Sequence, residues 1–326
     1  MKSPRIPTPS PLDDILLPTP PSQWPCTRAG VIEVSNAWYD ASKVAINEGA
    51  IELLPQGTIT PIAVEENVLG TTPATPGKYV DMAEATIALG AINHMFWEQQ
   101  DGQFTRYEHN GQVGAMAMTA AFEQAWADPV SPLRLARDQG VPLTAQSIRD
   151  VFGDIPVPES RVVILNQILL SEDLTYLAEV AQRTGQAGDP LGVEFAARLA
   201  DAFPLGYGDE VLKKAQLTTS GLWRQARQAG SVSMCDVTAF ADYQIPNVLR
   251  ALGLLDYSPE LSARIDCGEL IEANGAEERA IRAAAILGVD LLAKQQNVDV
   301  ADVDYWLWLK RKEPQTPFHR TRTTLY

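Results

Sequence analysis

The stretch GAEERAIRAAAILGVDLLAKQQ, residues 275–296, indicates the fold class of this chain. Its apolar residues recur at spacings of three and four positions, which gathers them on one face of an α-helix. The same spacing occurs in residues 42–54, 82–97, 114–127, 159–184, 188–203, 237–256 and 299–312. These segments predict a mainly α protein that folds as a single helical globule.

Two local patterns add detail to this helical prediction. Ser258, Pro259 and Glu260 combine an N-cap, a first-turn proline and a first-turn acid, so a helix is expected to start near residue 259. Residues 96–113 instead contain aromatic and β-branched residues between the turn signals Asp101-Gly102 and Asn110-Gly111. This segment predicts a small β hairpin or a three-stranded meander.

The N-terminal segment has a different composition. Residues 1–25 contain eight of the 23 prolines, and proline is incompatible with a helix interior. We therefore expect residues 1–30 to form an extended or disordered arm and residues 31–326 to form the helical domain.

Charge and cysteine content limit the possible partners and compartment. The formal net charge of -15 disfavours binding of intact nucleic acid but leaves room for a small anionic ligand in a local basic site. Three cysteines without paired spacing, no secretory signal pattern and no apolar run of about 20 residues predict a cytoplasmic protein that does not enter membranes. The oligomeric state is left open.

Common cofactor motifs are missing from the sequence. It has no Gly-rich phosphate loop, no GxGxxG after a strand and no HExxH or CxxC pair. The three histidines, His94, His109 and His319, are not spaced as helical metal ligands. We therefore expect neither a cofactor nor a metal, and we expect any chemistry to depend on carboxylates.

One such carboxylate lies in residues 237–257, VTAFADYQIPNVLRALGLLDY, where Asp242 stands between Phe240 and Tyr243. Burying an acid beside aromatic rings costs free energy unless a partner or ligand compensates for it. Asp242 is therefore a candidate catalytic anion. Two structural roles remain open, because it could also cap the helix expected after Pro246 or pair with a buried arginine.

A second acidic and aromatic pattern occupies residues 303–312, VDYWLWLKRK. Asp304, Trp308 and Arg311 fall at i, i+4 and i+7, on one helix face. An aromatic wall beside a carboxylate suits recognition of a nucleobase. The alternative is that Trp306 and Trp308 are core anchors and that Asp304 serves the helix N-terminus.

Two basic segments could meet a phosphate. The chain ends in PFHRTRTTLY, residues 317–326, where His319, Arg320 and Arg322 are basic and the flanking apolar residues could anchor the segment. The run KKAQ, residues 213–216, is another basic point, although a solvated helix face would also explain it.

In this order, the four stretches resemble the signature of the queuosine salvage family, the queuosine 5'-phosphate N-glycosylases/hydrolases. The matching residues are Lys214-Ala215-Gln216, Phe240-Ala241-Asp242-Tyr243 with Pro246, Asp304-Tyr305-Trp306-Leu307-Trp308, and Pro317 to Arg322. The match is strongest from Lys213 onward, with weaker similarity at Asn93 and upstream of residue 213. This chain departs from the family at residues 89–92, LGAI, where better-known eukaryotic members have an acidic residue, and the family's histidine-containing loop is not recognisable in residues 55–75.

The resemblance implies a helical body akin to DNA glycosylases that hydrolyses the N-glycosidic bond of queuosine 5'-monophosphate. Asp242 is then the catalytic residue. The implied substrate-binding residues are Asn93, Lys214, Phe240, Tyr243, Asp304, Tyr305, Trp308, His319 and Arg322. Two alternatives remain: a non-catalytic protein that binds queuine or a nucleoside, and a glycosylase for another modified nucleoside.

Overall fold

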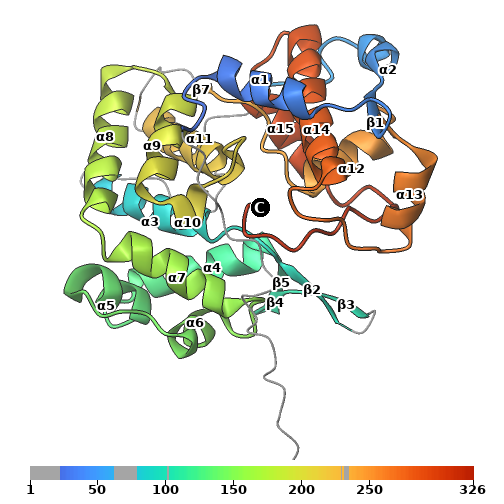
Figure 1. Ribbon diagram of the computed structural model, residues 1–326. Helices are drawn as coiled ribbons and strands as arrows, with labels where there is room; N and C mark the ends of the chain where they lie inside the picture. The colour runs from blue at the N-terminus through green and yellow to red at the C-terminus, as the bar shows by residue number, and fades with distance from the viewer. Residues whose placement is uncertain (1–22, 62–78, 101–102, 229, 231–234) are drawn as a thin grey trace, which may run out of the picture.

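The computed structural model describes residues 23–61, 79–100, 103–228, 230 and 235–326 (Figure 1). Its helices form two groups. The first group contains α3 (Tyr79–Ala91), α4 (Ala115–Ala127), α5 (Pro132–Gln139), α6 (Ala145–Phe152), α7 (Pro158–Leu169), α8 (Asp173–Ala187), α9 (Val193–Ala202), α10 (Pro204–Tyr207) and α11 (Lys213–Gln228). The second contains α1 (Arg28–Trp38), α2 (Glu48–Leu53), α12 (Gln244–Ala251), α13 (Pro259–Asp266), α14 (Ala276–Gln296) and α15 (Val300–Leu309). The prediction of a mainly α fold is confirmed.

The strands are short and form separate pairs. Three pairs are antiparallel: β1 (Val44–Ile46) with β8 (Leu255–Tyr257), β2 (Trp97–Gln100) with β3 (Gln103–Arg106), and β4 (Glu108–His109) with β5 (Gln112–Val113). The fourth pair, β6 (Leu191–Gly192) with β7 (Cys235–Asp236), is parallel. Residues 96–113 therefore form two hairpins. Asn110 and Gly111 both have positive φ, as a tight hairpin turn requires, whereas the turn expected at residues 101–102 lies outside the described residues.

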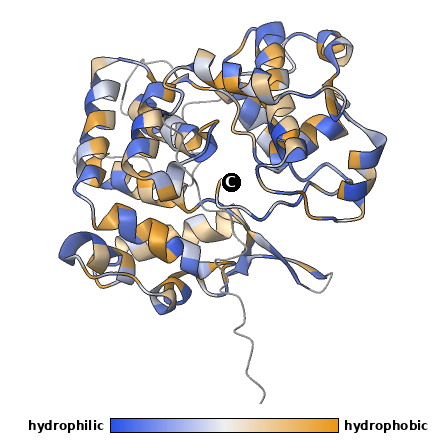
Figure 2. Ribbon diagram, viewed as in Figure 1, coloured by the Kyte–Doolittle hydropathy of each residue, from blue (hydrophilic) through white to orange (hydrophobic). Residues whose placement is uncertain are grey.

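The first group packs around α11, which contacts α3, α8 and α9. The outer helix α8 buries Leu174, Leu177, Ala178 and Ala181, a spacing that forms one apolar face, and Figure 2 shows hydrophilic residues on the same helix. α11 and α3 cross closely at Gly90, where an added Cβ would lie 1.9 Å from the Thr218 hydroxyl. Only glycine allows this approach.

The second group packs on α14, which contacts α1, α12 and α15. α14 begins with Glu277 and Glu278 in its first turn and ends at Asn297, which has φ 54°. α13 starts at Pro259, and the Ser258 side chain accepts a hydrogen bond from the Leu261 N–H at 3.2 Å. The predicted helix start near residue 259 is confirmed.

The C-terminal segment, residues 317–326, lies between the two groups (Figure 1). Its backbone joins both of them. Ile271 N–H donates to the Arg320 carbonyl at 2.8 Å, and Met95 N–H donates to the Tyr326 carbonyl at 3.4 Å. Residues 323–326 are all buried, so this segment is part of the packed structure.

Several predicted helix boundaries were wrong. The segment 159–184 divides into α7 and α8, residues 42–54 contain β1 as well as α2, and the helix expected over 82–97 ends at Ala91. In residues 237–256 only Gln244–Ala251 is helical, because Asp242 accepts hydrogen bonds at the start of α12 and Gly253, with φ 69°, follows its end.

The predicted arm, residues 1–30, falls mostly outside the described residues, and α1 already begins at Arg28 within it. The division into an arm and a helical domain stays a prediction. None of the helices in the described part of the chain combines the length and the apolar character that a membrane crossing requires.

Candidate active site

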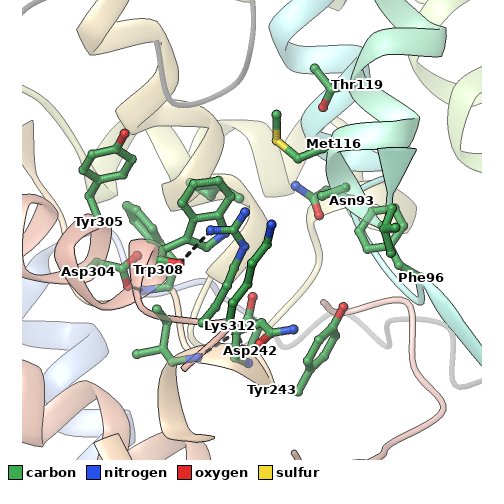
Figure 3. Close-up of a pocket in the computed structure, with 18 of the residues that line it drawn as sticks. Asn93, Phe96, Met116, Thr119, Asp242, Tyr243, Asp304, Tyr305, Trp308 and Lys312 are labelled. Atoms are coloured by element: carbon green, nitrogen blue, oxygen red, sulfur yellow. Dashed lines mark hydrogen bonds between the residues drawn. The ribbon is translucent and has the colours of Figure 1, made fainter. Parts of the chain in front are cut away.

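A cavity of about 650 Å³ lies where the two helical groups meet the hairpins (Figure 3). The segment that follows α3, the hairpins and α4 line one side, and Figure 3 shows Asn93, Phe96, Met116 and Thr119 there. α15 lines the opposite side with Asp304, Tyr305 and Trp308. α11 and residues 240–245 complete the wall, so the cavity is built from segments far apart in the sequence.

Asp242 lies at this wall just before α12. Its Oδ1 accepts hydrogen bonds from the backbone N–H groups of Gln244, at 2.6 Å, and Ile245, at 3.2 Å. Its Oδ2 lies 3.5 Å from the Lys213 ammonium nitrogen. The side chain is 18% exposed. Asp242 therefore caps the first turn of α12, although this helix begins at Gln244 and not after Pro246 as expected. Its second oxygen pairs with a cavity lysine rather than with a buried arginine.

Asp304 occupies the middle of α15 and is buried. Its Oδ2 accepts a hydrogen bond from the Phe240 N–H at 2.8 Å, so it does not serve the N-terminus of its own helix. Burial, reinforced by the nearby charge of Asp242, raises the pKa of Asp304 to about 7. Both protonation states of this carboxyl group are therefore populated near neutral pH.

Aromatic rings stand on both sides of these carboxylates. Tyr305 and Trp308 stack with ring centroids 6.0 Å apart, and the Arg311 guanidinium carbon lies 3.5 Å from the centroid of Trp308. Tyr243 stacks on Phe318 with centroids 4.4 Å apart. Phe240 also lines the cavity. These rings provide apolar walls suited to a flat heteroaromatic base.

The cavity is basic although the chain is acidic. Five basic side chains line it, against two acidic ones: Arg106, Lys213, Arg224, Arg311 and Lys312 against Asp242 and Asp304. With a net charge of -15 for the whole chain, this local excess of positive charge singles out the cavity as a place for a small anion.

Three residues expected in the site do not line the cavity. Lys214 is buried and donates to the Ala91 carbonyl at 2.6 Å, and burial holds the pKa of its ammonium group far below the usual value. His319 lies 3.3 Å from the Tyr326 hydroxyl, and burial lowers its pKa to about 3. Arg322 donates to the Gln99 carbonyl at 2.8 Å. All three side chains therefore contact residues that do not line the cavity.

Sequence reasoning did not single out Arg224, Lys312, Met116 or Thr119. For Arg224 a signal was present. Lys213, Leu217, Ser220 and Arg224 all line the cavity from α11, at the positions i, i+4, i+7 and i+11 of one helix face. A helix predicted over residues 213–228 would have placed Arg224 on the same helix face as Lys213.

The geometry provides fixed charges around the cavity. In the described ranges, no three His, Cys, Asp or Glu side chains gather into a group that could hold a metal ion. The cavity instead offers one paired carboxylate, one buried carboxyl group with a pKa near neutrality, and several cations. Carboxylates arranged around an aromatic-lined cavity are able to stabilise a developing positive charge on a sugar.

Comparisons with known proteins agree on one family. The family model described as queuosine salvage protein matches residues 80–326. The queuosine 5'-phosphate N-glycosylase/hydrolase of Sphaerobacter thermophilus is 31% identical over 277 residues, covering 75% of this chain and 81% of that protein. The Mus musculus protein of the same name is 30% identical over 286 residues, covering 73% and 80%. This chain belongs to the queuosine salvage protein family.

Proposed function

We propose that this protein hydrolyses the N-glycosidic bond of queuosine 5'-monophosphate and releases the base queuine. One observation carries the proposal: Asp242 and Asp304 line the same aromatic-walled cavity, together with five basic side chains. The relatives that carry the name queuosine 5'-phosphate N-glycosylase/hydrolase support the choice of substrate.

The reaction breaks the bond between C1' of the ribose and the base nitrogen. The bonding electron pair leaves with the base and positive charge develops on C1' and the ring oxygen. Water then adds its oxygen to C1', and the proton that this water loses ends on the base nitrogen. Asp242 supplies the anion beside this charge. Its Oδ1 is held by two backbone N–H groups, so the carboxylate is oriented before substrate binds.

Queuine is a 7-deazaguanine, so protonation at N7 is not available to activate the leaving group. Stabilisation of the departing base must therefore come from its pyrimidine edge. In this proposal Asp304, on α15 across the cavity from Asn93, accepts hydrogen bonds from ring N–H groups and so orients the base, with Tyr305 and Trp308 beside it. The secondary amine of queuine, protonated at neutral pH, also favours acidic neighbours.

The 5'-phosphate binds the basic side chains of the cavity in this proposal. One phosphate needs only one or two charge-assisted contacts, whereas tRNA needs a broad basic face. The overall charge of -15 argues against such a face, so the substrate is a small molecule rather than intact nucleic acid. Three unpaired cysteines, Cys26, Cys235 and Cys267, fit a reducing compartment, and we place the reaction in the cytoplasm.

The test is timed release of free base by the purified protein. Queuosine 5'-monophosphate, queuosine and intact modified tRNA are incubated separately, and queuine is quantified by liquid chromatography. Catalytic release from the monophosphate is expected. Binding of the monophosphate without release would instead identify a queuine- or nucleoside-binding protein, and release from a different nucleoside alone would reassign the substrate.

A further inference from the structure

Behind the cavity wall lies a buried arginine that the proposed chemistry does not use. Arg282, on α14, is fully buried and is not among the residues that line the cavity. Its Nε donates to the Ala241 carbonyl at 3.1 Å, and its Nη2 donates to Asp209 Oδ2 at 2.6 Å. One planar guanidinium therefore holds two separate segments of the chain.

Both segments lead directly into the cavity. Ala241 is bonded to Asp242. Asp209 Oδ2, besides binding Arg282, accepts the backbone N–H of Lys213 at 2.8 Å at the start of α11. Because the Lys213 ammonium lies 3.5 Å from Asp242, these contacts close a ring that runs from Asp242 through Arg282 and Asp209 to Lys213 and back.

The backbone immediately before Lys213 has an unfavourable conformation. Leu212, immediately before Lys213, has φ 56°, a conformation that residues other than glycine seldom adopt. Such a conformation persists only where surrounding contacts impose it. Asp209 supplies two of them, since its carbonyl accepts the Leu212 N–H at 2.8 Å and its carboxylate accepts the Lys213 N–H.

The positive charge of the buried Arg282 is compensated by Asp209 and Glu278 together. Burial disfavours the charged guanidinium, but the carboxylates of Asp209 and Glu278 outweigh this effect and raise the pKa of Arg282. Glu278 Oε1 lies 3.5 Å from Arg282 Nη1. A buried ion pair of this kind is weak evidence for stability and is better explained by what it positions.

We propose that Arg282 is a positioning residue that fixes Lys213 and Asp242 relative to each other and thereby sets the rate of base release without touching the substrate. This inference rests on the proposed function. The inference extends that function by assigning a role to two buried residues, Arg282 and Asp209, that lie outside the cavity.

The decisive variant is Arg282→Lys. Lysine keeps the charge beside Asp209 but has no second, rigidly placed donor for the Ala241 carbonyl. Small misplacements of catalytic groups cost up to about 100-fold, so kcat is expected to fall on the order of 10- to 100-fold, with KM nearly unchanged. If the pair is only structural, the variant melts earlier but keeps the wild-type kcat at temperatures where it is folded.

Arg137→Lys is the matched control. Arg137 binds both oxygens of the buried Glu84, at 2.9 Å from Nε and 2.5 Å from Nη2, and neither residue lines the cavity. The same substitution there also keeps the charge and removes a two-point contact. We expect it to lower the melting temperature without lowering kcat. An equal loss of kcat in both variants would overturn the proposal.

A double-mutant cycle with Lys213→Met tests the route of the effect. If Arg282 acts by holding Lys213 against Asp242, Arg282→Lys costs much less in the Lys213→Met background than in the wild type. Fully multiplicative losses would refute the proposal. If Arg282→Lys fails to fold, Asp209→Asn replaces it in the cycle. A smaller loss in the Lys213→Met background would again support the proposal, and fully multiplicative losses would refute it.

Turnover of the wild type distinguishes failure of the proposed function from failure of the positioning role of Arg282. If the wild type releases no base from any nucleoside monophosphate, the proposed function fails. If the wild type is active and Arg282→Lys retains its kcat, the positioning role alone fails.

Discussion

The Asp304 carboxylate accepts a hydrogen bond from the backbone N–H of Phe240, with 2.8 Å between Oδ2 and the nitrogen. This contact joins the middle of α15 to the segment that leads into Asp242. Asp304 itself is 5% exposed and lines the cavity. A buried acid in this position ties the stability of the fold to pH.

The pH dependence of stability should follow from this burial. Burial raises the pKa of Asp304 to about 7, so its protonated form favours folding. That contribution is complete below the pKa of an unfolded aspartate and is lost as the pH rises through about 7. Between pH 5 and pH 8 the free energy of unfolding of the wild type should therefore fall more than that of Asp304→Asn, by roughly 1–3 kcal/mol. Urea unfolding at both pH values measures the difference, and parallel decreases would contradict it.

Asp242→Asn should abolish base release while the fold survives. The amide oxygen still accepts the Gln244 N–H, but the charge that meets the oxocarbenium ion is lost, at a cost on the order of 100- to 1000-fold in rate. Asp266→Asn is a suitable control, because Asp266 pairs with Arg250 at 2.8 Å outside the cavity lining. Turnover near the wild-type value in Asp242→Asn would remove Asp242 from the mechanism.

Stacking on the cavity wall gives a third prediction. Trp308→Ala and Phe240→Ala should each weaken binding of queuine by roughly 1–3 kcal/mol, measured by calorimetry. Trp306 lies on the same helix outside the cavity lining, where Lys310 lies 5.0 Å from its ring, so Trp306→Ala serves as the control. If the cavity variants bind queuine as the wild type does and only melt earlier, these rings are core anchors.

Local sequence patterns predicted several helices and one helix start close to their observed bounds. α4, α14 and α15 fall within a few residues of their predicted bounds, and Pro259 starts α13 as expected. α11 was not predicted. Its polar residues Gln216 and Gln225 are buried and hydrogen-bonded to Thr238 and Thr86 in other segments, so no apolar face marks it in the sequence. The polar contacts that bury α11 need tertiary structure to explain them.

The candidate site was likewise predicted only in part from the sequence. Asp242, Asp304 and Trp308 were predicted from acids placed among aromatic residues, and all three line one cavity. Whether Lys213 or its neighbour Lys214 would face that cavity depended on the register of α11, which composition does not contain. The basic C-terminal segment was expected to offer ligands, but burial of His319 and the contact of Arg322 with Gln99 bind it to the framework.

The last prediction concerns recognition of the 5'-phosphate. Lys312 lines the cavity (Figure 3), whereas Lys214 donates to the Ala91 carbonyl outside the lining. We expect a higher kcat/KM for queuosine 5'-monophosphate than for queuosine in the wild type. Lys312→Ala should reduce this preference about 10-fold or more, since one charge-assisted contact contributes roughly 1.5–3 kcal/mol. Specificity constants for both substrates give the ratio directly.

Lys310→Ala controls for the loss of a charge on the same segment, because Lys310 pairs with Glu313 at 3.4 Å and does not line the cavity. It should leave the ratio unchanged. Lys214→Ala should lower stability but likewise keep the preference for the monophosphate, since its ammonium group contacts the framework. A preference lost in Lys214→Ala and kept in Lys312→Ala would reverse the assignment. Equal rates on nucleoside and monophosphate in the wild type would show that the basic side chains of the cavity do not select for phosphate.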